Sequence, residues 1–324
     1  MAVTSEVFDA AERTAQGKAR RSAIEDRAFY LLTLVSAIFV VVMLLGVMVS
    51  LIVGAWPALE KFGLGFVWQQ RWSPVKEIFG ALAPIYGTLI TSIIAMIIGI
   101  PVSFGIAIFL TEICPPALRR PIGVAIELLA GIPSIIYGLW GFFFLAPFLA
   151  ANVQPFLDAT LAHIPVVGLL FVDSGSGLNL MTAGIILAIM VLPFIASITR
   201  DVFLTVPVLL RESAYGMGMT TWEVVRHIVI PYTRIGLVGG IMLGLGRALG
   251  ETMAVTFVIG NSYVIHPSLL KPATTISASI ANEFTEATSG LYTSSLIALG
   301  LVLFVITFAV LAIAKWLLVR SDVK

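Results

Sequence analysis

Six long apolar stretches constrain the fold of this chain more than any other feature of its sequence. Each is longer than the roughly 20 residues that an α-helix needs to cross a hydrocarbon core about 30 Å thick. Strands of a membrane barrel would instead be shorter and would alternate apolar with polar residues. We therefore expect an all-α integral membrane protein. The expected transmembrane helices are residues 28–55, 85–110, 122–149, 180–204, 235–260 and 294–318.

The composition agrees with a membrane protein and not with a soluble domain. Of the 324 residues, 59% are hydrophobic and 11% are charged, and the mean hydropathy is +1.04. An ordinary soluble domain carries about 25% charged residues. The net charge is +1 and no basic patch occurs, so we expect membrane lipid as the surrounding and no nucleic acid partner.

Basic residues predict the orientation of the chain in the membrane. The first apolar stretch is too long for a signal peptide, so we expect a retained helix that follows a polar tail, residues 1–27. Lys and Arg concentrate in this tail, in the loop between the fourth and fifth stretches, and at the C-terminus, residues 319–324. The positive-inside rule therefore places both termini in the cytoplasm and makes residues 56–84 an external loop.

No group of residues in the sequence indicates covalent chemistry or a metal site. Cys114 is the single cysteine, and the three histidines lie in predicted loops without a second ligand at metal spacing. No nucleophile is paired with a base, and Gly17-Lys18 is not part of a phosphate-binding loop. We expect no catalytic residue, no metal ion and no cofactor bound by this chain.

The fifth apolar stretch contains two charges, in the segment GRALGETMA, residues 246–254. Arg247 and Glu251 are four residues apart, which would place them on one face of a continuous helix and allow an ion pair. A charge at the bilayer centre costs at least about 2.5 to 3.5 kcal/mol, so both should face the bundle interior or a water-filled path. A structural pair is one interpretation. The other is an anion path, in which the guanidinium of Arg247 binds an oxyanion and Glu251 keeps that binding weak.

The third apolar stretch contains another acid, Glu127, in the segment ELLAGIPSIIYGLWG. We expect this acid to be buried. Gly131 and Pro133 can interrupt the helix just after it and leave free backbone groups near a cavity. Glu127 is equally compatible with a packing role and with a place in a substrate pathway.

The loop between the fourth and fifth stretches, residues 207–231, predicts two short helices. Pro207 suits the first turn of the first helix, and glycines at 216 and 218 end it. Thr220 and Glu223 then have the spacing of a capping box, which begins the second helix. We expect Trp222, Val225 and Val229 to form an apolar stripe on that helix, and Pro231 to end it.

Two short helices with an exposed Trp and an acidic residue suit a docking surface for another protein. An amphipathic segment lying on the lipid surface is the other interpretation of the same pattern. The patterning of apolar and polar residues leaves both open.

The order of residues in this loop resembles the EAA loop of ABC importer permeases, with Ser213 and Ile230 in place of the usual Ala and Leu. The resemblance implies a six-helix type I ABC importer permease bundle in which this loop is a cytoplasmic coupling helix seated on an ATPase. That ATPase would be a partner chain that uses ATP and Mg. The residues expected to couple to it are Glu212, Ala214, Gly218, Thr220, Trp222, Glu223, Ile228 and Pro231.

Further segments resemble the phosphate-specific permeases: PIYGTLITS, ELLAGIPSIIYGLWG, GRALGETMAVTFVIGN and SIANEF, with FVWQQRWSP similar to the PstC branch. The resemblance implies a subunit of a high-affinity phosphate importer in a bacterial inner membrane, with residues 85–318 as the permease core. Its implied partners are a PstA-type permease, a PstB-type ATPase dimer and an external PstS-type phosphate-binding protein. The expected substrate pathway consists of Arg247, Glu251, Thr252 and Glu127.

Other functions remain open on the residues alone. One alternative is an ABC permease for another anion, such as molybdate or sulfate, and the anion that restores growth in a null strain would discriminate. A membrane enzyme could use Glu127, Arg247 and Glu251 on a phosphorylated lipid, although no nucleophile and base are paired. A secondary transporter is a further alternative, but the sequence shows no evident inverted repeat.

Overall fold

The computed structural model describes residues 2–161, 164–165, 167–172 and 175–321, and within them the chain is helical. Two isolated β-bridges, Ser73 with Ile78 and Gly260 with Ala273, are the extent of strand pairing in these residues. In this part of the chain, six helical segments are long and apolar enough to cross a membrane, which confirms the predicted all-α membrane class. These segments are Glu25–Phe62, Leu82–Ile113, Ser134–Leu161, Leu180–Leu204, Thr221–Leu249 and Gly290–Trp316.

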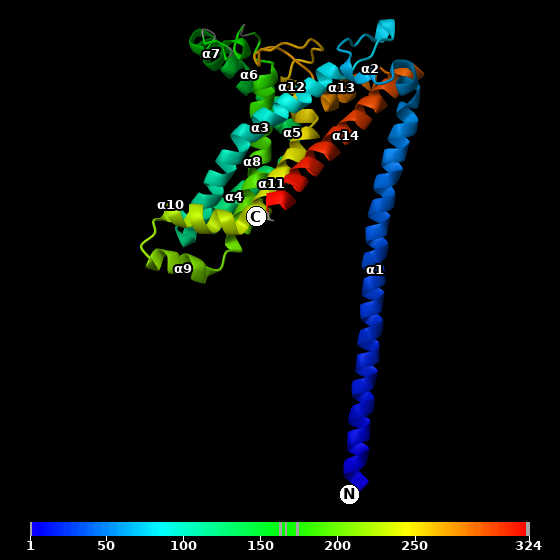
Figure 1. The fold of residues 1–324 in the computed structure, drawn as a ribbon, viewed down its shortest axis with the longest axis vertical. Coiled ribbons are helices and arrows are strands. Elements are labelled where there is room, and N and C mark those ends of the chain that lie inside the picture. Colours follow the sequence, from blue (N-terminus) through cyan, green and yellow to red (C-terminus); the bar gives the residue numbers. More distant parts are fainter. Residues whose placement is uncertain (1, 162–163, 166, 173–174, 322–324) are drawn as a thin grey trace. The chain divides into compact units, whose positions relative to one another are not determined.

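Figure 1 shows the helices, several of which are shorter or longer than the apolar stretches suggested. Four π-helical turns join some of them: Phe109–Ile113, Gly141–Leu145, Leu149–Val153 and Val225–Val229. The α-helices are α1 (Ala2–Phe62), α2 (Gly65–Trp68), α3 (Leu82–Ile108), α4 (Pro116–Ala130), α5 (Ser134–Trp140), α6 (Ala146–Phe148), α7 (Gln154–Leu161), α8 (Leu180–Leu204), α9 (Val208–Gly216), α10 (Thr221–Val224), α11 (Ile230–Leu249), α12 (Met253–Val258), α13 (Ile276–Glu283) and α14 (Gly290–Ser321).

The chain divides after Val53 into two compact units. The first unit is the part of α1 up to that residue, and all its residues from Glu25 to Val47 are exposed. Large apolar side chains such as Phe39 and Val40 are 61% and 65% exposed. A helix that is apolar on all sides requires lipid or another protein around it.

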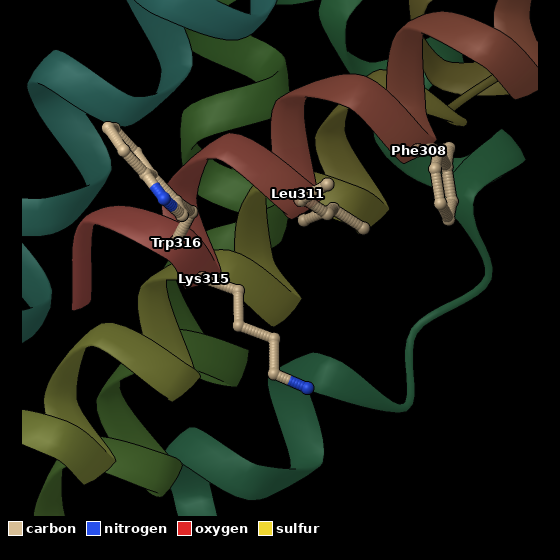
Figure 2. Close-up of a pocket in the computed structure, with 5 residues that line it drawn as sticks. Phe308, Leu311, Lys315 and Trp316 are labelled. Atoms are coloured by element: carbon tan, nitrogen blue, oxygen red, sulfur yellow. The ribbon is translucent and has the colours of Figure 1, made fainter. Parts of the chain in front are cut away.

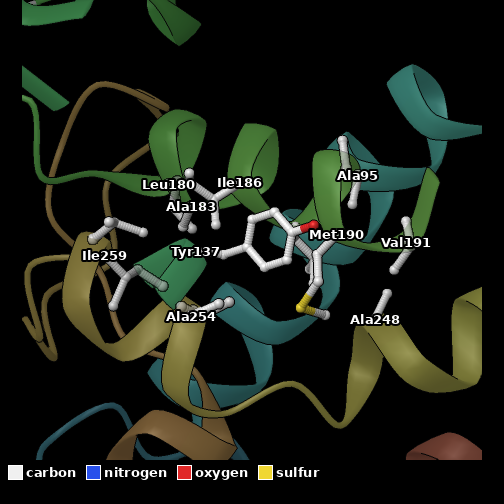
Figure 3. Packing of buried hydrophobic residues seen from close by; sticks show 14 of the residues in the cluster. Ala95, Tyr137, Leu180, Ala183, Ile186, Met190, Val191, Ala248, Ala254 and Ile259 are labelled. Atoms are coloured by element: carbon white, nitrogen blue, oxygen red, sulfur yellow. The ribbon is translucent and has the colours of Figure 1, made fainter. Parts of the chain in front are cut away.

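In the second unit, α8 is the central helix of the bundle and contacts α3, α4, α5, α11 and α12. Its side chains Ile186, Leu187, Val191 and Ile195 are fully buried. Figure 3 shows part of this apolar cluster, with residues of α8 surrounded by those of neighbouring helices. Gly184 permits the close approach of α3, because a Cβ there would lie 2.5 Å from a methyl of Ile94.

A second apolar cluster joins the C-terminal end of α1 to the first turns of α14. The Ser294 hydroxyl accepts a hydrogen bond from the Ala58 N–H at 3.0 Å and donates one to the Gly54 carbonyl at 2.9 Å. Beside this cluster, Glu283 accepts hydrogen bonds from Trp72 Nε1 and the Tyr263 hydroxyl, both at 3.1 Å. Burial raises the pKa of Tyr263, so its hydroxyl stays protonated and remains a donor.

The third apolar stretch forms two helices where the length of residues 122–149 suggested one. Helix α4 ends at Ala130, and α5 begins at Ser134. The interruption follows from Gly131 and Pro133, as their positions predicted, because Pro lacks the N–H that would continue the helix.

Candidate functional site

The helix that carries Arg247 ends two residues after it. Helix α11 stops at Leu249, residues 250–252 are not helical, and α12 begins at Met253. The prediction of one continuous helix over 235–260, with Arg247 and Glu251 on the same face, is therefore wrong. Gly250 forms the C-terminal cap, and glycine is a weak helix former, so the backbone turns away there.

Glu251 is directed to α12 and not to Arg247. Its Oε1 accepts a hydrogen bond from the Ala254 N–H at 3.4 Å, at the start of α12. Among the described residues, Arg247 forms no ion pair. The predicted intrahelical pair is absent because the two residues do not share a helix. The guanidinium of Arg247 is consequently exposed next to a helix interruption.

Thr252, the third residue of the interruption, lines a pocket of about 490 Å³. The pocket lies between the α11–α12 junction and helices α13 and α14. Its hydroxyl-bearing residues are Thr252, Ser277 and Thr285, and the remaining lining is apolar or glycine. The structure thus brings Arg247, Glu251 and Thr252 to one helix interruption, although only Thr252 lines the pocket.

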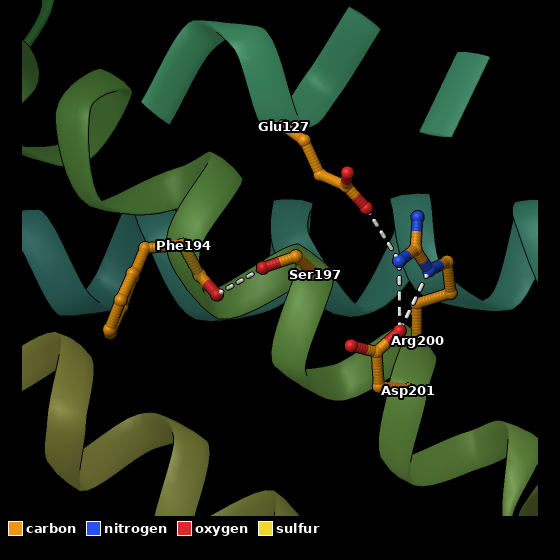
Figure 4. Close-up of polar contacts among 5 residues, drawn as sticks. All are labelled: Glu127, Phe194, Ser197, Arg200 and Asp201. Carbon is orange, nitrogen blue, oxygen red and sulfur yellow. Dashed lines mark hydrogen bonds and ion pairs between the residues drawn. The ribbon is translucent and has the colours of Figure 1, made fainter. Parts of the chain in front are cut away.

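Glu127 lies elsewhere, on α4, where it pairs with Arg200 of α8. Its Oε1 is 2.7 Å from Arg200 Nη2, and the same nitrogen is 2.8 Å from Asp201 Oδ1 (Figure 4). The expectation of a buried acid is wrong within the described residues, because the Glu127 side chain is 49% exposed. Gly123 is the one buried residue of α4, and Arg200 fills the space beside it.

Arg200 and Asp201 were missed by reasoning from the sequence. The signal was available, since they are two adjacent charges inside the apolar stretch 180–204. Charges in such a stretch are costly without a partner and therefore mark a site or an interhelical pair. Here Arg200 forms an interhelical pair with Glu127, and Asp201 pairs with Arg200 on the same helix.

A separate pocket of about 550 Å³ lies against the C-terminal half of α14 (Figure 2). Phe308, Leu311, Ala312, Lys315 and Trp316 line it. The Lys315 ammonium is the one charged group among these residues, and none of the predicted site residues contributes to the pocket.

The loop after α8 contains the predicted capping box. The Thr220 N–H donates to Glu223 Oε2 at 2.8 Å, and the Glu223 N–H donates to Thr220 Oγ1 at 3.4 Å. Helix α9 ends at Gly216, and Gly218 has φ +85°, a left-handed conformation that favours glycine. Glu212, Thr220, Trp222 and Glu223 are exposed, whereas Ala214 is fully buried.

Two expectations about the second short helix are wrong. Pro231 does not end it, because α10 continues through the π-helical turn Val225–Val229 into α11, where Pro231 occupies the first turn. A proline inside a membrane helix is tolerated where a local π-helical adjustment, here the turn Val225–Val229, re-satisfies the freed backbone groups. Trp222 does not share the apolar stripe, since it is 61% exposed while Val225 and Val229 are buried.

Comparison with known proteins identifies the family. The chain is 60% identical over 324 residues to the phosphate transport system permease protein PstC of Mesorhizobium japonicum, covering 100% of this chain and 99% of that protein. The chain belongs to the PstC family. The PstC proteins of Pasteurella multocida and Xylella fastidiosa (strain 9a5c) are 56% identical over 288 residues and 53% identical over 322 residues. The Pasteurella match spans 89% of this chain and 90% of that protein. The Xylella match spans 99% of both.

A broader family contains the PstC family and agrees with the fold. The family described as binding-protein-dependent transport system inner membrane component matches residues 103–321 of this chain. A crystal structure of a bacterial alginate ABC transporter in complex with an alginate pentasaccharide-bound periplasmic protein has a chain with the same fold. Its TM-score is 0.60 at 17% identity, over 90% of this chain and 93% of that one. PstC membership confirms the expected permease, which is a transport subunit and not an ATPase.

Proposed function

We propose that this chain is the channel-forming subunit of an ATP-driven importer that moves inorganic phosphate across a bacterial inner membrane. The observation that carries the proposal is the full-length identity of 60% to a phosphate transport system permease protein. The membrane subunit performs no covalent chemistry in this proposal. It alternates between outward and inward access while a partner chain hydrolyses ATP.

Arg247 binds the phosphate in transit. Its guanidinium offers a planar set of donors that matches phosphate oxygens, and no carboxylate among the described residues occupies it. The neighbouring interruption at residues 250–252 supports this role, because irregular backbone at membrane depth is tolerated where it is buried in protein or lines a water-filled cavity.

Glu251 and Thr252 complete the proposed path. The Glu251 carboxylate, held at the start of α12, repels an anion that stays near Arg247 and so favours its release. The Thr252 hydroxyl offers a neutral hydrogen-bond partner at the adjoining pocket. Less supports a place for Glu127 in the path, because its ion pair with Arg200 already gives it a structural role as a contact between α4 and α8.

The loop containing α9 and α10 is the proposed seat of the ATPase. Glu212, Trp222 and Glu223 are exposed there, and apolar side chains beneath them anchor the loop to α3, α8 and α11. The complete transporter would contain a PstA-type permease, a PstB-type ATPase dimer that uses ATP and Mg, and an external PstS-type phosphate-binding protein. Both termini of this chain would be cytoplasmic.

Reconstitution of the complete transporter tests this function. Uptake of radiolabelled inorganic phosphate into proteoliposomes should depend on ATP and on the phosphate-binding protein, and excess sulfate or molybdate should not compete. Preferred uptake of sulfate or molybdate would assign a different oxyanion. Turnover of a phosphorylated lipid by this chain alone would contradict the transport role.

A further inference from the structure

A largely buried ion pair connects the loop containing α9 and α10, here called the coupling loop, to the transmembrane bundle. Arg211 lies on α9, immediately before the exposed Glu212, and Glu112 lies in the π-helical turn Phe109–Ile113 that follows α3. Arg211 Nη1 is 3.0 Å from Glu112 Oε1, and the two side chains are 15% and 4% exposed. Arg211 also donates a hydrogen bond through Nη2 to the carbonyl of Phe203, near the end of α8.

One side chain therefore holds three elements together: α9, the end of α3 and the end of α8. An apolar cluster that includes Ala107, Phe203 and Ala214 draws on the same three elements. Because the pair is withdrawn from water, the attraction between its charges is screened much less than that of an exposed pair. Adjacent residues of α9 thus have different environments, with Glu212 exposed and the Arg211 side chain 15% exposed.

The pair retains hydrogen-bonding capacity that its present geometry does not use. Arg211 Nε is buried without a hydrogen-bond partner among the described residues, and Glu112 Oε1 contacts Arg211 Nη1 as an ion pair without the geometry of a hydrogen bond. The π-helical turn that carries Glu112 is a type of element often found at functional sites.

We propose that the Arg211–Glu112 pair is a tether that transmits displacement of the coupling loop to α3 and α8. Packed apolar side chains transmit a push, but they resist a pull poorly, because a gap of about 0.5 to 1 Å already forfeits a quarter to a half of the dispersion attraction. The attraction between charges falls only with the inverse of distance. An ion pair therefore keeps the helices joined when the ATPase draws the loop away. This role rests on the proposed coupling function of the loop.

The alternative is a pair that only stabilises the fold. Replacement of a buried ion pair by apolar residues of similar volume is often neutral or stabilising, whereas removal of one partner is strongly destabilising. The informative variant is therefore the double substitution Glu112→Met with Arg211→Met. If the pair serves stability alone, this variant should assemble and remain fully coupled. If the pair is a tether, the variant should assemble but lose the coupling between the loop and the bundle.

The test measures conformational response in the assembled transporter in membranes, without reliance on the substrate. A cysteine introduced at Thr252 reports on the interruption between α11 and α12, because native Cys114 is 1% exposed and contributes little alkylation by N-ethylmaleimide. ATP should change the alkylation rate in the otherwise native protein, and the variant with Glu112→Met and Arg211→Met should lose most of that change. Arg211→Lys, which keeps the charge, should retain the ATP-dependent change.

The matched control is the exposed pair Lys61–Glu77, whose atoms lie 3.1 Å apart with side chains 46% and 53% exposed. Its double-Met variant should keep the full ATP-dependent change. An unaltered response in the Glu112/Arg211 double-Met variant, its failure to assemble, or loss of the response in Arg211→Lys would each overturn the tether. Lack of phosphate uptake by the native transporter would instead contradict the proposed substrate, which this alkylation test does not use.

Discussion

Arg247 and Glu251 are four residues apart in sequence but do not share a helix, since α11 ends at Leu249 and Glu251 lies in the non-helical residues before α12, where its Oε1 accepts a hydrogen bond from the Ala254 N–H. The guanidinium is thereby separated from the carboxylate that a continuous helix would have placed beside it. This separation removes the structural explanation of the two charges as an intrahelical pair. It favours a role for Arg247 toward a mobile anion.

Arg247→Gln should lower phosphate uptake by about tenfold to a hundredfold, because a hydrogen bond to a charged group contributes about 1.5 to 3 kcal/mol. Arg247→Lys should have an intermediate effect, since it keeps the charge and loses the planar fork of donors. The measurement is initial uptake into proteoliposomes at equal amounts of assembled transporter. Equal uptake in Arg247→Gln and the native protein would remove Arg247 from the path.

The charge swap Arg247→Glu with Glu251→Arg gives a stricter form of the same test. It should assemble normally and bind the ATPase, because no ion pair between these residues supports the fold. Phosphate uptake should remain low, since the anion would meet a carboxylate where it needs a cation. Near-native uptake in the swap would remove both residues from the phosphate path.

Substitutions in the loop containing α9 and α10 should uncouple transport while the protein stays inserted in the membrane. Gly218 has φ +85°, whereas proline requires about −65°, so Gly218→Pro should misplace α10. Glu212→Ala should weaken ATPase binding without changing the loop, because Glu212 is exposed. Co-purification of the ATPase and uptake are the readouts, and native values of both in the two variants would contradict the coupling assignment.

The capping box should stabilise α10 locally. Thr220→Ala removes the side-chain oxygen that accepts from the Glu223 N–H and should destabilise the helix start by about 1 kcal/mol. Faster amide hydrogen exchange at Glu223 would report this change. Thr220→Ser keeps the hydroxyl and should exchange at the native rate, so equal acceleration in both variants would argue against the cap.

The orientation of the chain follows from its basic residues. A reporter fused after Lys324, which lies outside the described residues, should be cytoplasmic. A reporter inserted near Ser176 should be external. The opposite result for both fusions would place the loop containing α9 on the outside, where it could not meet an ATPase.

Two glycines of α3 should respond oppositely to alanine. A Cβ at Gly87 would lie 1.9 Å from the carbonyl oxygen of Thr274, so Gly87→Ala should destabilise the protein by about 1 to 3 kcal/mol or more. A Cβ at Gly105 meets no atom of this chain within 4 Å, and Gly105→Ala should be neutral or stabilise by up to about 1 kcal/mol. Thermal denaturation of the purified transporter measures both, and equal Tm values for the two variants would contradict the packing of α3 on residue 274.

Local patterns in the sequence determined the class, the number of spans and the details of short segments. Apolar length alone requires helices, because backbone groups in a membrane need partners within their own segment. The capping box of Thr220 and Glu223 was equally predictable, since both of its hydrogen bonds join residues three positions apart. The interruption between α4 and α5 followed from Gly131 and Pro133 for the same local reason.

Only the tertiary structure decided which charges meet and where α11 ends. Glycines are common inside membrane helices, so Gly246 and Gly250 did not distinguish a continuous helix from a broken one. The separate α12 packs closely on α5, where a Cβ at Gly138 would lie 3.1 Å from the Ala254 Cα. Likewise, Glu127 pairs with Arg200, 73 residues away, and Glu112 with Arg211. A partner this distant in sequence depends on how helices pack, and no spacing along one helix contains that information.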